Sequence, residues 1–419
     1  MVSASSTRYR PRLVDPLLDE LLEQLPAMLV LGPRTAGKTT TLERRAATVV
    51  RLDRQTGAAA FEADPDVALR GLPEPVLLDE WQRVPGVLGA VRRAVEADPH
   101  PNRFYVTGSV RAELEHEVWP GTGRIVRLTM YPMTVREQLG RGGSSLLDKV
   151  ADGEELTVPE DCPDLRGYVE LALRSGFPDA ALRLTGHARE VWLESYIEDL
   201  LSHDVEQLEE TLGRRRDRQR LRRYLQAYAL NSAGVAEHKT IYDAAQINKA
   251  TATAYDDLLA GLLIAENVPA WTSNRLKRLV HRPKRYLIDA ALIATALRLD
   301  EQGVIDDGDL LGRILDTFVA AQLRPELATS ATRPRLHHLR TEQGRHEIDL
   351  IAELAGQRVV GIEVKASAAP TAREDAKHLR WLREELGERF LAGIVLHTGP
   401  RAYELEEKII AAPIAVLWG

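Results

Sequence analysis

Residues 32–40 read GPRTAGKTT, which matches the phosphate-loop pattern G-x-x-x-x-G-K-[ST]. The apolar run AMLVL (27–31) precedes the loop and the helical stretch TTLERRAA (40–47) follows it, so a strand, a glycine-rich turn and a helix are expected in that order. Backbone N–H groups of such a loop surround phosphate oxygens, and the helix N-terminus adds the positive end of its dipole. We therefore expect nucleotide contacts from Gly32, Pro33, Arg34, Thr35, Ala36, Gly37, Lys38, Thr39 and Thr40.

A phosphate loop also assigns roles to single side chains. Lys38 is expected to reach the β- and γ-phosphates of ATP, and the Thr39 hydroxyl to bind Mg²⁺. A second acid is expected at the end of another strand, and PVLLDE (75–80) supplies it. Asp79 would hold Mg²⁺ through water, and Glu80 would orient or deprotonate the attacking water.

Two further positions are candidates for sensing or neutralising the phosphates. Thr107 or Ser109, at the end of the strand FYVTGS (104–109), could sense the γ-phosphate. An arginine often neutralises the transferring phosphoryl group. Arg124, in PGTGRIVRL, is the leading candidate and Arg34 is the second, with a surface salt bridge as the alternative for each.

The composition indicates a soluble globular protein. The chain has 419 residues, 44% of them hydrophobic and 28% charged, which is typical of about two to three domains. The net charge of −7 excludes a uniformly basic surface but allows a local basic face. A single cysteine, Cys162, excludes a disulfide framework and fits a reducing compartment. No apolar run approaches the roughly 20 residues of a membrane span, so we expect a cytoplasmic protein with no membrane contact.

Pattern changes divide the chain into four segments. Residues 1–140 alternate short apolar strands with helices, which predicts a parallel α/β sheet. Residues 141–164 are rich in Gly, Ser, Asp and Pro and are expected to form a linker. Residues 165–305 are mostly helical, and TIYDAAQINKATATAYDDLLAGLLI (240–264) followed by two strand-like runs predicts a winged helix. Residues 306–419 are expected to form a second α/β domain.

The last segment contains HEIDLIAELAGQRVVGIEVKAS (346–367). Glu363 and Lys365 lie on one face of a predicted strand, and Asp349 lies on the preceding strand. This is the D…E-x-K arrangement of restriction-endonuclease-like nucleases. Asp349 and Glu363 would hold Mg²⁺, Lys365 would position water or stabilise the transition state, and Asp316 could be an additional metal-binding acid on the preceding helix. The alternatives are a half-exposed hairpin and a nuclease-like fold that does not cleave.

Two stretches of the middle segment could contact nucleic acid. The run GRRRDRQRLRR (213–223) could follow a phosphate backbone, or it could be a solvated helix face. In the second helix of the predicted helix-turn-helix, Asp256 and Asp257 would repel DNA. The residues of that helix that could touch DNA are Lys249, Thr251, Thr253 and Tyr255. The alternative is a winged helix that serves as a protein-interaction module.

The motifs together resemble a known family. GPRTAGKTT, VLLDEWQ, FYVTGS and TGRIVRL resemble the AAA-type ATP-binding domain of bacterial and archaeal proteins that end in the domain of unknown function 4143. SGFPDA, ESYIEDLLSHDV, KRYLIDAAL, GRILDTFV and HEIDLIAE…GIEVKAS resemble the rest of those proteins in the same order. The resemblance implies an ATPase domain, a winged-helix-like middle and a restriction-endonuclease-like end. Family members commonly have Glu where this chain has Asp316, whose reach is one methylene shorter.

The sequence therefore predicts an α/β protein: a P-loop ATPase sheet, a helical domain with a winged helix, and a restriction-endonuclease-like domain. We expect a Mg²⁺-dependent ATPase that acts on nucleic acid, with DNA favoured over RNA and nuclease activity open. The alternative is a non-nucleolytic, ATP-driven switch that gates a protein partner, as in defence or toxin–antitoxin systems.

Overall fold

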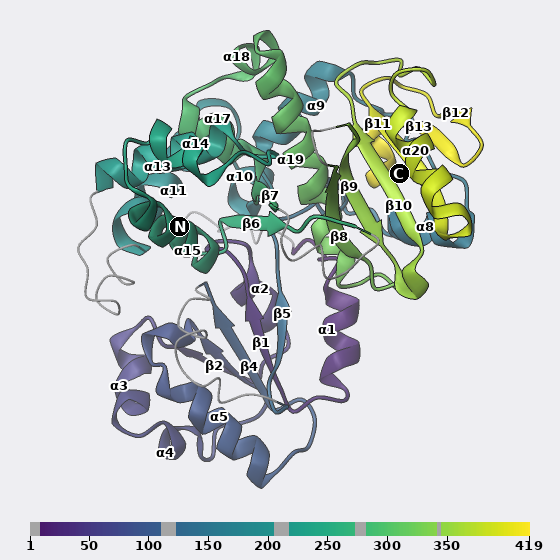
Figure 1. Ribbon diagram of the computed structural model, residues 1–419. Helices are drawn as coiled ribbons and strands as arrows, with labels where there is room; N and C mark the ends of the chain where they lie inside the picture. Colours follow the sequence, from purple (N-terminus) through teal and green to yellow (C-terminus); the bar gives the residue numbers. More distant parts are fainter. Residues whose placement is uncertain (1–8, 110–122, 205–217, 273–281, 342–344) are drawn as a thin grey trace.

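The computed structural model describes residues 9–109, 123–204, 218–272, 282–341 and 345–419 (Figure 1). In that view the N-terminal sheet lies at the bottom, the helical middle at the upper left and the C-terminal sheet at the upper right. No helix in the described ranges is long and apolar enough to cross a membrane.

The N-terminal part is a five-stranded parallel sheet with the order β2-β3-β4-β1-β5, which confirms the predicted fold class. Its strands are β1 (Ala27–Leu31), β2 (Thr48–Arg51), β3 (Val76–Asp79), β4 (Phe104–Gly108) and β5 (Val126–Thr129). Its helices are α1 (Asp15–Leu22), α2 (Lys38–Glu43), α3 (Gln55–Ala63), α4 (Pro65–Leu69), the short 3₁₀ helix η1 (Trp81–Arg83) and α5 (Gly86–Ala97).

Strand β1 is apolar at every position because both of its faces are covered. Leu29 and Leu31 belong to one hydrophobic cluster of this part, whereas Met28 and Val30 belong to another. Successive side chains of a strand point to opposite faces. A continuous apolar run is therefore what a central parallel strand requires, and it ends where the phosphate loop begins.

The middle part is helical. It comprises α7 (Val135–Leu139), α8 (Leu146–Asp152), α9 (Leu165–Arg174), α10 (Pro178–Leu182), α11 (Gly186–Asp199), the π-helix η2 (Leu200–Asp204), α13 (Arg218–Leu230), α14 (His238–Ala244), α15 (Lys249–Gly261), α17 (Ala290–Leu297) and α18 (Glu301–Asp306). The antiparallel strands β6 (Ala265–Val268) and β7 (Lys284–Leu287) follow α15. Helices α14 and α15 and this strand pair occupy the stretch predicted to be a winged helix, and that assignment stays a prediction.

Residues 141–164 are more ordered than the predicted linker. Ser145 caps the N-terminus of α8 through its side chain, and Gly153 ends the helix in the left-handed conformation. Leu146 and Leu147 are fully buried. Ser145 and Gly153, two of the residues that suggested a linker, are therefore helix caps.

The C-terminal part is a six-stranded mixed sheet with the order β12-β13-β11-β10-β9-β8. Its elements are α19 (Gly308–Leu327), β8 (Arg335–Arg340), β9 (Glu347–Glu353), η4 (Ala355–Gln357), β10 (Val359–Val364), α20 (Lys377–Leu386), η5 (Gly387–Arg389), β11 (Phe390–His397), β12 (Tyr403–Glu406), β13 (Ile409–Pro413) and η6 (Ile414–Leu417). Leu379 and Leu382 of α20 pack on one face of the sheet, whereas Ile314 and Phe318 of α19 belong to the core on the other face.

The helical middle and the C-terminal sheet share one hydrophobic core. The same cluster contains Tyr168 of α9, Tyr224 of α13, Leu315 of α19 and Ile362 of β10. The predicted boundary between residues 305 and 306 therefore does not separate two cores.

Candidate functional sites

Two glycines shape the loop that follows β1. A Cβ atom on Gly32 would lie 2.2 Å from the Met130 carbonyl oxygen, so no larger residue fits there without a backbone shift. Gly37 has φ 97°, a left-handed conformation that favours glycine, and directly precedes α2. The first and last glycines of the motif are thus required by the backbone.

Lys38 folds back over this loop. Its side chain is buried, and Nζ donates hydrogen bonds to the carbonyl oxygens of Gly32 and Pro33, both at 2.9 Å. The ammonium group therefore lies inside the curve of the loop, where an incoming phosphate would meet it.

Asp79 lies at the centre of the site, at the end of β3. Its Oδ1 accepts hydrogen bonds from the Thr39 hydroxyl at 2.7 Å and from the Thr107 hydroxyl at 2.5 Å. Its Oδ2 is 3.2 Å from Arg51 Nη1. The Thr39 hydroxyl and the Asp79 carboxylate form an all-oxygen set, which fits Mg²⁺.

Arg51 was not predicted. It ends β2, and the register of the parallel pair places it beside Asp79. Its Nη2 also lies 3.2 Å from Glu43 Oε2 on α2. Only the strand order, which places β2 beside β3, makes Arg51 a neighbour of Asp79.

Glu80 is held in an unusual position next to Asp79. Its backbone is left-handed, with φ 62° and ψ 55°, which is uncommon for a residue other than glycine. Its N–H donates to the Thr107 hydroxyl at 3.1 Å. Its carboxylate accepts hydrogen bonds from Gln82 Nε2 at 2.5 Å and from the Ser109 hydroxyl at 3.3 Å. Thr107 and Ser109 thus fix the acids of the site, and Gln82 is an additional contact that was not predicted.

Arg12 supports the loop from behind and was also missed. Its guanidinium donates to the carbonyl oxygens of Ala36 and Tyr131, each at 2.8 Å, and to Glu137 Oε1 at 3.0 Å. The side chain is buried. No local pattern could show this contact, because its partners lie far along the chain.

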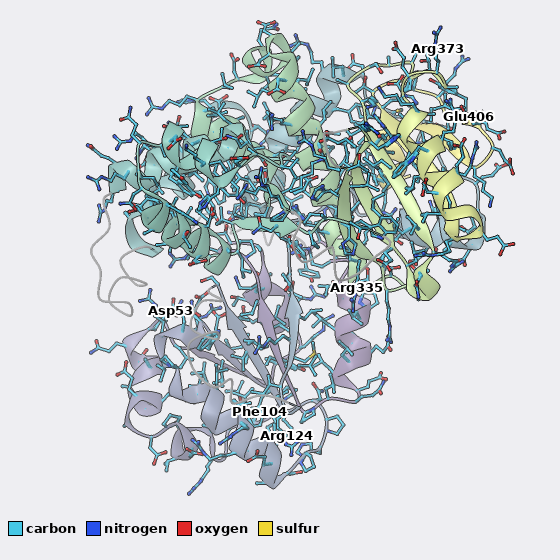
Figure 2. All side chains as sticks on the ribbon, in the orientation of Figure 1. Asp53, Phe104, Arg124, Arg335, Arg373 and Glu406 are labelled. Carbon is cyan, nitrogen blue, oxygen red and sulfur yellow. The ribbon has the colours of Figure 1, made fainter. Side chains whose placement is uncertain are left out.

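The structure does not bring Arg124 to the phosphate loop of its own chain. Arg124 precedes β5, whose Val126 pairs with Met28 near the start of the parallel strand β1. The loop lies at the opposite end of β1, and Figure 2 labels Arg124 and Phe104, the first residue of β4, at the same lower end of the N-terminal sheet. The second candidate, Arg34, stays in the loop, where its carbonyl accepts a hydrogen bond from the Tyr196 hydroxyl of α11 at 3.5 Å.

A second polar site lies in the C-terminal part. The antiparallel register pairs Leu350 with Ile362 and so brings Asp349 next to Glu363. Asp349 Oδ2 accepts a hydrogen bond from the Val364 N–H at 3.0 Å, and Lys365 Nζ donates to Glu363 Oε2 at 2.9 Å. Asp316 of α19 faces the same cavity of about 500 Å³. The four predicted residues of this site are therefore brought together.

A lysine from the middle part enters this cluster. Lys284 of β7 is 3% exposed. Its Nζ donates to Asp316 Oδ2 at 2.5 Å and to Asp349 Oδ1 at 3.1 Å. The Tyr286 hydroxyl donates to the other Asp316 oxygen at 2.9 Å. Sequence reasoning missed Lys284 because it lies in a different predicted domain from both acids.

Burial and mutual charge raise the pKa values of Lys284, Asp316 and Glu363 in this cluster. Burial opposes the charge of Lys284, but Asp316 and Asp349 outweigh it and raise the pKa of Lys284 well above its usual value. Burial raises the pKa of Asp316 to about 6, against the effect of Lys284. Burial, assisted by the charge of Asp349, raises the pKa of Glu363 to about 8. Lys284 is therefore the charged partner around which the acids are arranged.

The predicted metal set of Asp316, Asp349 and Glu363 does not fit a metal ion in this arrangement. Within the described part of the chain, no group of three or more His, Cys, Asp or Glu side chains is placed to hold a metal. The Lys284 ammonium group lies between Asp316 and Asp349, where it pairs with one carboxylate oxygen of each.

Packing buries one of the residues of α15 that were predicted to contact DNA. Tyr255 is buried and packs against Tyr224, so it cannot contact DNA. Asp256 faces inward and lies 3.0 Å from His238 Nε2. Lys249 and Thr253 remain exposed.

The basic run 213–223 lies partly outside the described residues. Of its described part, Arg222 pairs with Glu198 and Arg223 Nε donates to the Ala245 carbonyl at 3.3 Å. Arg222 and Arg223 are thus engaged by neighbouring groups, and the role of the run in nucleic-acid binding stays a prediction.

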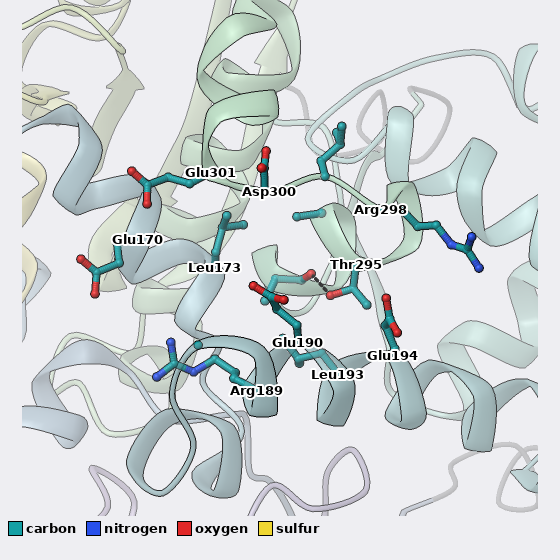
Figure 3. A pocket seen from close by; sticks show the side chains of 14 residues that line it. Glu170, Leu173, Arg189, Glu190, Leu193, Glu194, Thr295, Arg298, Asp300 and Glu301 are labelled. Carbon is teal, nitrogen blue, oxygen red and sulfur yellow. Dashed lines mark hydrogen bonds between the residues drawn. The ribbon is translucent and has the colours of Figure 1, made fainter.

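A further cavity of about 510 Å³ lies between α9, α11 and α17 (Figure 3). Acidic side chains from several helices surround it, including Glu170, Glu190 and Glu194, together with Arg298. These four side chains are exposed to solvent, and we assign the cavity no role.

Three family models match the chain. They are an AAA domain over residues 24–139, a domain of unknown function (DUF8612) over 165–303 and a domain of unknown function (DUF4143) over 311–417. The AAA domain followed by DUF4143 confirms the resemblance inferred from the motifs. The division into segments 1–140, 141–164, 165–305 and 306–419 stays a prediction.

Similar proteins are known from mycobacteria and, more distantly, among solved structures. Uncharacterized proteins of Mycobacterium bovis and Mycobacterium tuberculosis are each 28% identical over 401 residues, 94% of this chain and 82% of theirs. Cdc6p of Pyrobaculum aerophilum aligns with 70% of this chain and 97% of its own at 15% identity and a TM-score of 0.24. The Orc1 protein of Aeropyrum pernix in complex with DNA aligns with 70% and 95% at 14% identity and a TM-score of 0.25. TM-scores this low do not establish a shared overall fold.

Proposed function

Since the chain combines an AAA domain with a DUF4143 domain, we propose that it is a Mg²⁺-dependent ATPase that acts on nucleic acid, with DNA the favoured partner. The observation that carries the ATPase proposal is the 2.7 Å contact between the Thr39 hydroxyl and Asp79 Oδ1, with Glu80 as the next residue. A phosphate loop, a metal-binding acid and a base at neighbouring strand ends are what phosphoryl transfer to water requires.

Each side chain has a separate role in this proposal. Lys38 binds the β- and γ-phosphates, and Thr39 and Asp79 hold Mg²⁺. When bound, Mg²⁺ neutralises charge on the phosphates. Glu80 orients the attacking water and accepts its proton. Thr107 links the two acids, since its hydroxyl donates to Asp79 and accepts from the Glu80 N–H.

Steady-state ATPase measurements and nucleotide binding test this proposal. Lys38→Ala should abolish turnover. Glu80→Gln should keep ATP binding but lower kcat by about 100-fold or more, the usual contribution of a general base. Glu96→Gln, which changes an exposed glutamate of α5 in the same way, is the matched control and should behave as wild type. Full turnover of Glu80→Gln would show that another group is the base.

The nucleic-acid part of the proposal rests on the exposed face of α15. Lys249 and Thr253 are both exposed on this helix, where a helix-turn-helix presents its contacts. Lys249→Ala should weaken binding to all duplex sequences alike and reduce the salt dependence of log Kd by about one. Fluorescence anisotropy with duplex DNA, single-stranded DNA and RNA would measure this, and unchanged binding would place the contact elsewhere.

One observation favours the second candidate, an ATP-driven switch that gates a protein partner without cleaving nucleic acid. Lys284 takes up the carboxylates on which a metal-dependent nuclease would depend. Incubation of the protein with DNA and Mg²⁺ or Mn²⁺, beside a Glu363→Ala variant, separates the two candidates. If the wild-type protein cleaves DNA and the Glu363→Ala variant does not, the second candidate, a switch without nuclease activity, is excluded.

A further inference from the structure

The C-terminal acidic cluster contains its own cation. Lys284 Nζ lies within hydrogen-bonding distance of three oxygens: Asp316 Oδ2 at 2.5 Å, Asp349 Oδ1 at 3.1 Å and the Asp349 carbonyl at 3.3 Å. An ammonium group has three N–H donors, so these contacts account for all of them. The side chain is 4% exposed. Water therefore weakens the attraction between its charge and the two carboxylates very little.

The strand that carries Lys284 is fastened to the C-terminal sheet. Residues just after β6 pair with the edge strand β8, through a bond from the Trp271 N–H to the His338 carbonyl at 2.6 Å and one from the His338 N–H to the Pro269 carbonyl at 3.0 Å. On the other side of the hairpin, His338 Nε2 lies 2.9 Å from the Arg282 carbonyl, two residues before Lys284. These contacts hold the backbone on both sides of the strand pair against β8 and so place Lys284 beside the cluster.

We propose that Lys284 is the resident cation of this cluster and that Asp316 and Asp349 bind its ammonium group in place of a divalent metal ion. The proposal does not depend on the ATPase activity, because it concerns residues of β7, α19 and β9 only. Its physical basis is that the buried carboxylate of Asp316, beside the partly buried carboxylate of Asp349, needs a compensating positive charge. Lys284 supplies that charge from within the chain, so a metal would have to displace it.

Mn²⁺ binding to the nucleotide-free protein, measured by the electron paramagnetic resonance signal of free Mn²⁺, tests this proposal. Wild type and Asp349→Asn should bind the same amount of Mn²⁺, since no ion uses Asp349. Lys284→Met should gain one Mn²⁺ site, and the double variant Lys284→Met/Asp349→Asn should lose it. Any weak binding at the phosphate loop is common to all variants and cancels in the comparison.

Lys365→Met is the matched control, because it removes the lysine that pairs with Glu363 but leaves Lys284 in place. It should gain no site that depends on Asp349. A wild-type protein that binds one Mn²⁺ ion lost in Asp349→Asn would overturn the proposal. A folded Lys284→Met that gains no site, or a Lys365→Met that gains the same site, would overturn it too. If circular dichroism shows that Lys284→Met does not fold, the comparison of wild type with Asp349→Asn decides alone.

Discussion

At the scale of the residue, the arrangement of the nucleotide site depends on the hydrogen bonds of the Thr107 hydroxyl. The sequence placed Thr107 at a strand end and suggested contact with phosphate. In the structure its hydroxyl donates to Asp79 and accepts from the Glu80 N–H. The left-handed backbone of Glu80 costs free energy of about 1–3 kcal/mol, and the Thr107 contact holds it in place. Thr107 therefore positions the two acids in relation to each other.

Replacement of Thr107 by Val tests this role. The change keeps the shape of the side chain and removes both hydrogen bonds. Because hydrogen bonds to charged groups contribute about 1.5–3 kcal/mol, kcat should fall by about 10- to 100-fold while ATP binding changes little. Thr48→Val, which removes a hydroxyl bonded to the Pro73 carbonyl, should leave kcat unchanged. Equal losses in ATP affinity and kcat would instead indicate a direct phosphate contact.

Glu363 makes stability depend on pH. Its pKa in the folded protein is about 8, above the ordinary value of 4.5. The group therefore stabilises the fold fully below pH 4.5, and this contribution is lost as pH rises through about 8, because the unfolded chain releases the proton first. Urea denaturation should show that Glu363→Gln removes part of the fall in free energy of unfolding between these pH values. Glu384→Gln, at an exposed position of α20, should keep the wild-type slope.

At the scale of the element, helix α7 joins the nucleotide loop to the rest of the molecule. Thr134 and Glu137 form a capping box at its start. Glu137 also accepts hydrogen bonds from Arg12 Nε at 3.0 Å and from the Leu13 N–H at 2.7 Å. One carboxylate thus both begins a helix and fixes the N-terminal segment that supports the loop.

Removal of this carboxylate should loosen the loop. In Glu137→Ala, Arg12 would be left buried without its charged partner, and the free energy of unfolding should fall by about 3 kcal/mol or more. The KM for ATP should rise, because Arg12 would no longer be held against Ala36. Chemical denaturation and ATPase kinetics would measure both effects. Glu170→Ala, at an exposed position of α9, is the control, and a Glu137→Ala variant of normal stability would contradict this reading.

The site residues that were predicted correctly are those whose position follows from the residues next to them in the sequence. Asp79 and Glu80 follow an apolar run directly, and Gly37 precedes a helix, so local pattern was sufficient. Arg12, Arg51 and Lys284 join these sites through strand order and packing between distant segments, which one sequence does not reveal. Arg124 was misplaced for the same reason, since its distance from the loop depends on the direction of β5.

At the scale of the whole molecule, a chain of contacts connects the two sites. Arg12 binds both the Ala36 carbonyl of the loop and the Tyr131 carbonyl. The Tyr131 hydroxyl donates to Glu266 of β6 at 3.2 Å, and Glu266 pairs with the buried Arg324 of α19 at 3.1 Å. Helix α19 also carries Asp316. These contacts give a continuous physical route along which the two sites could be coupled.

Hydrogen exchange would show whether nucleotide binding changes the protection of amides along this chain of contacts. In wild type, ATP should change the exchange of amides in β6 and α19. Tyr131→Phe removes only the hydroxyl, so this change should shrink while ATP binding is kept. Tyr242→Phe, on α14, is the control and should respond as wild type does. An undiminished response of Tyr131→Phe would mean that the sites communicate by another route or through the packed core.

Because the middle and C-terminal parts share one hydrophobic core, a truncation between them would divide that core. Ile314, Leu315 and Phe318 of α19 are buried in a cluster completed by Tyr168, Tyr224 and Trp418. A fragment beginning at residue 306 would expose this apolar face of α19 to water, and exposed apolar surfaces promote aggregation. The last two-thirds of the chain should therefore be expressed, exchanged between homologues and melted as a single module.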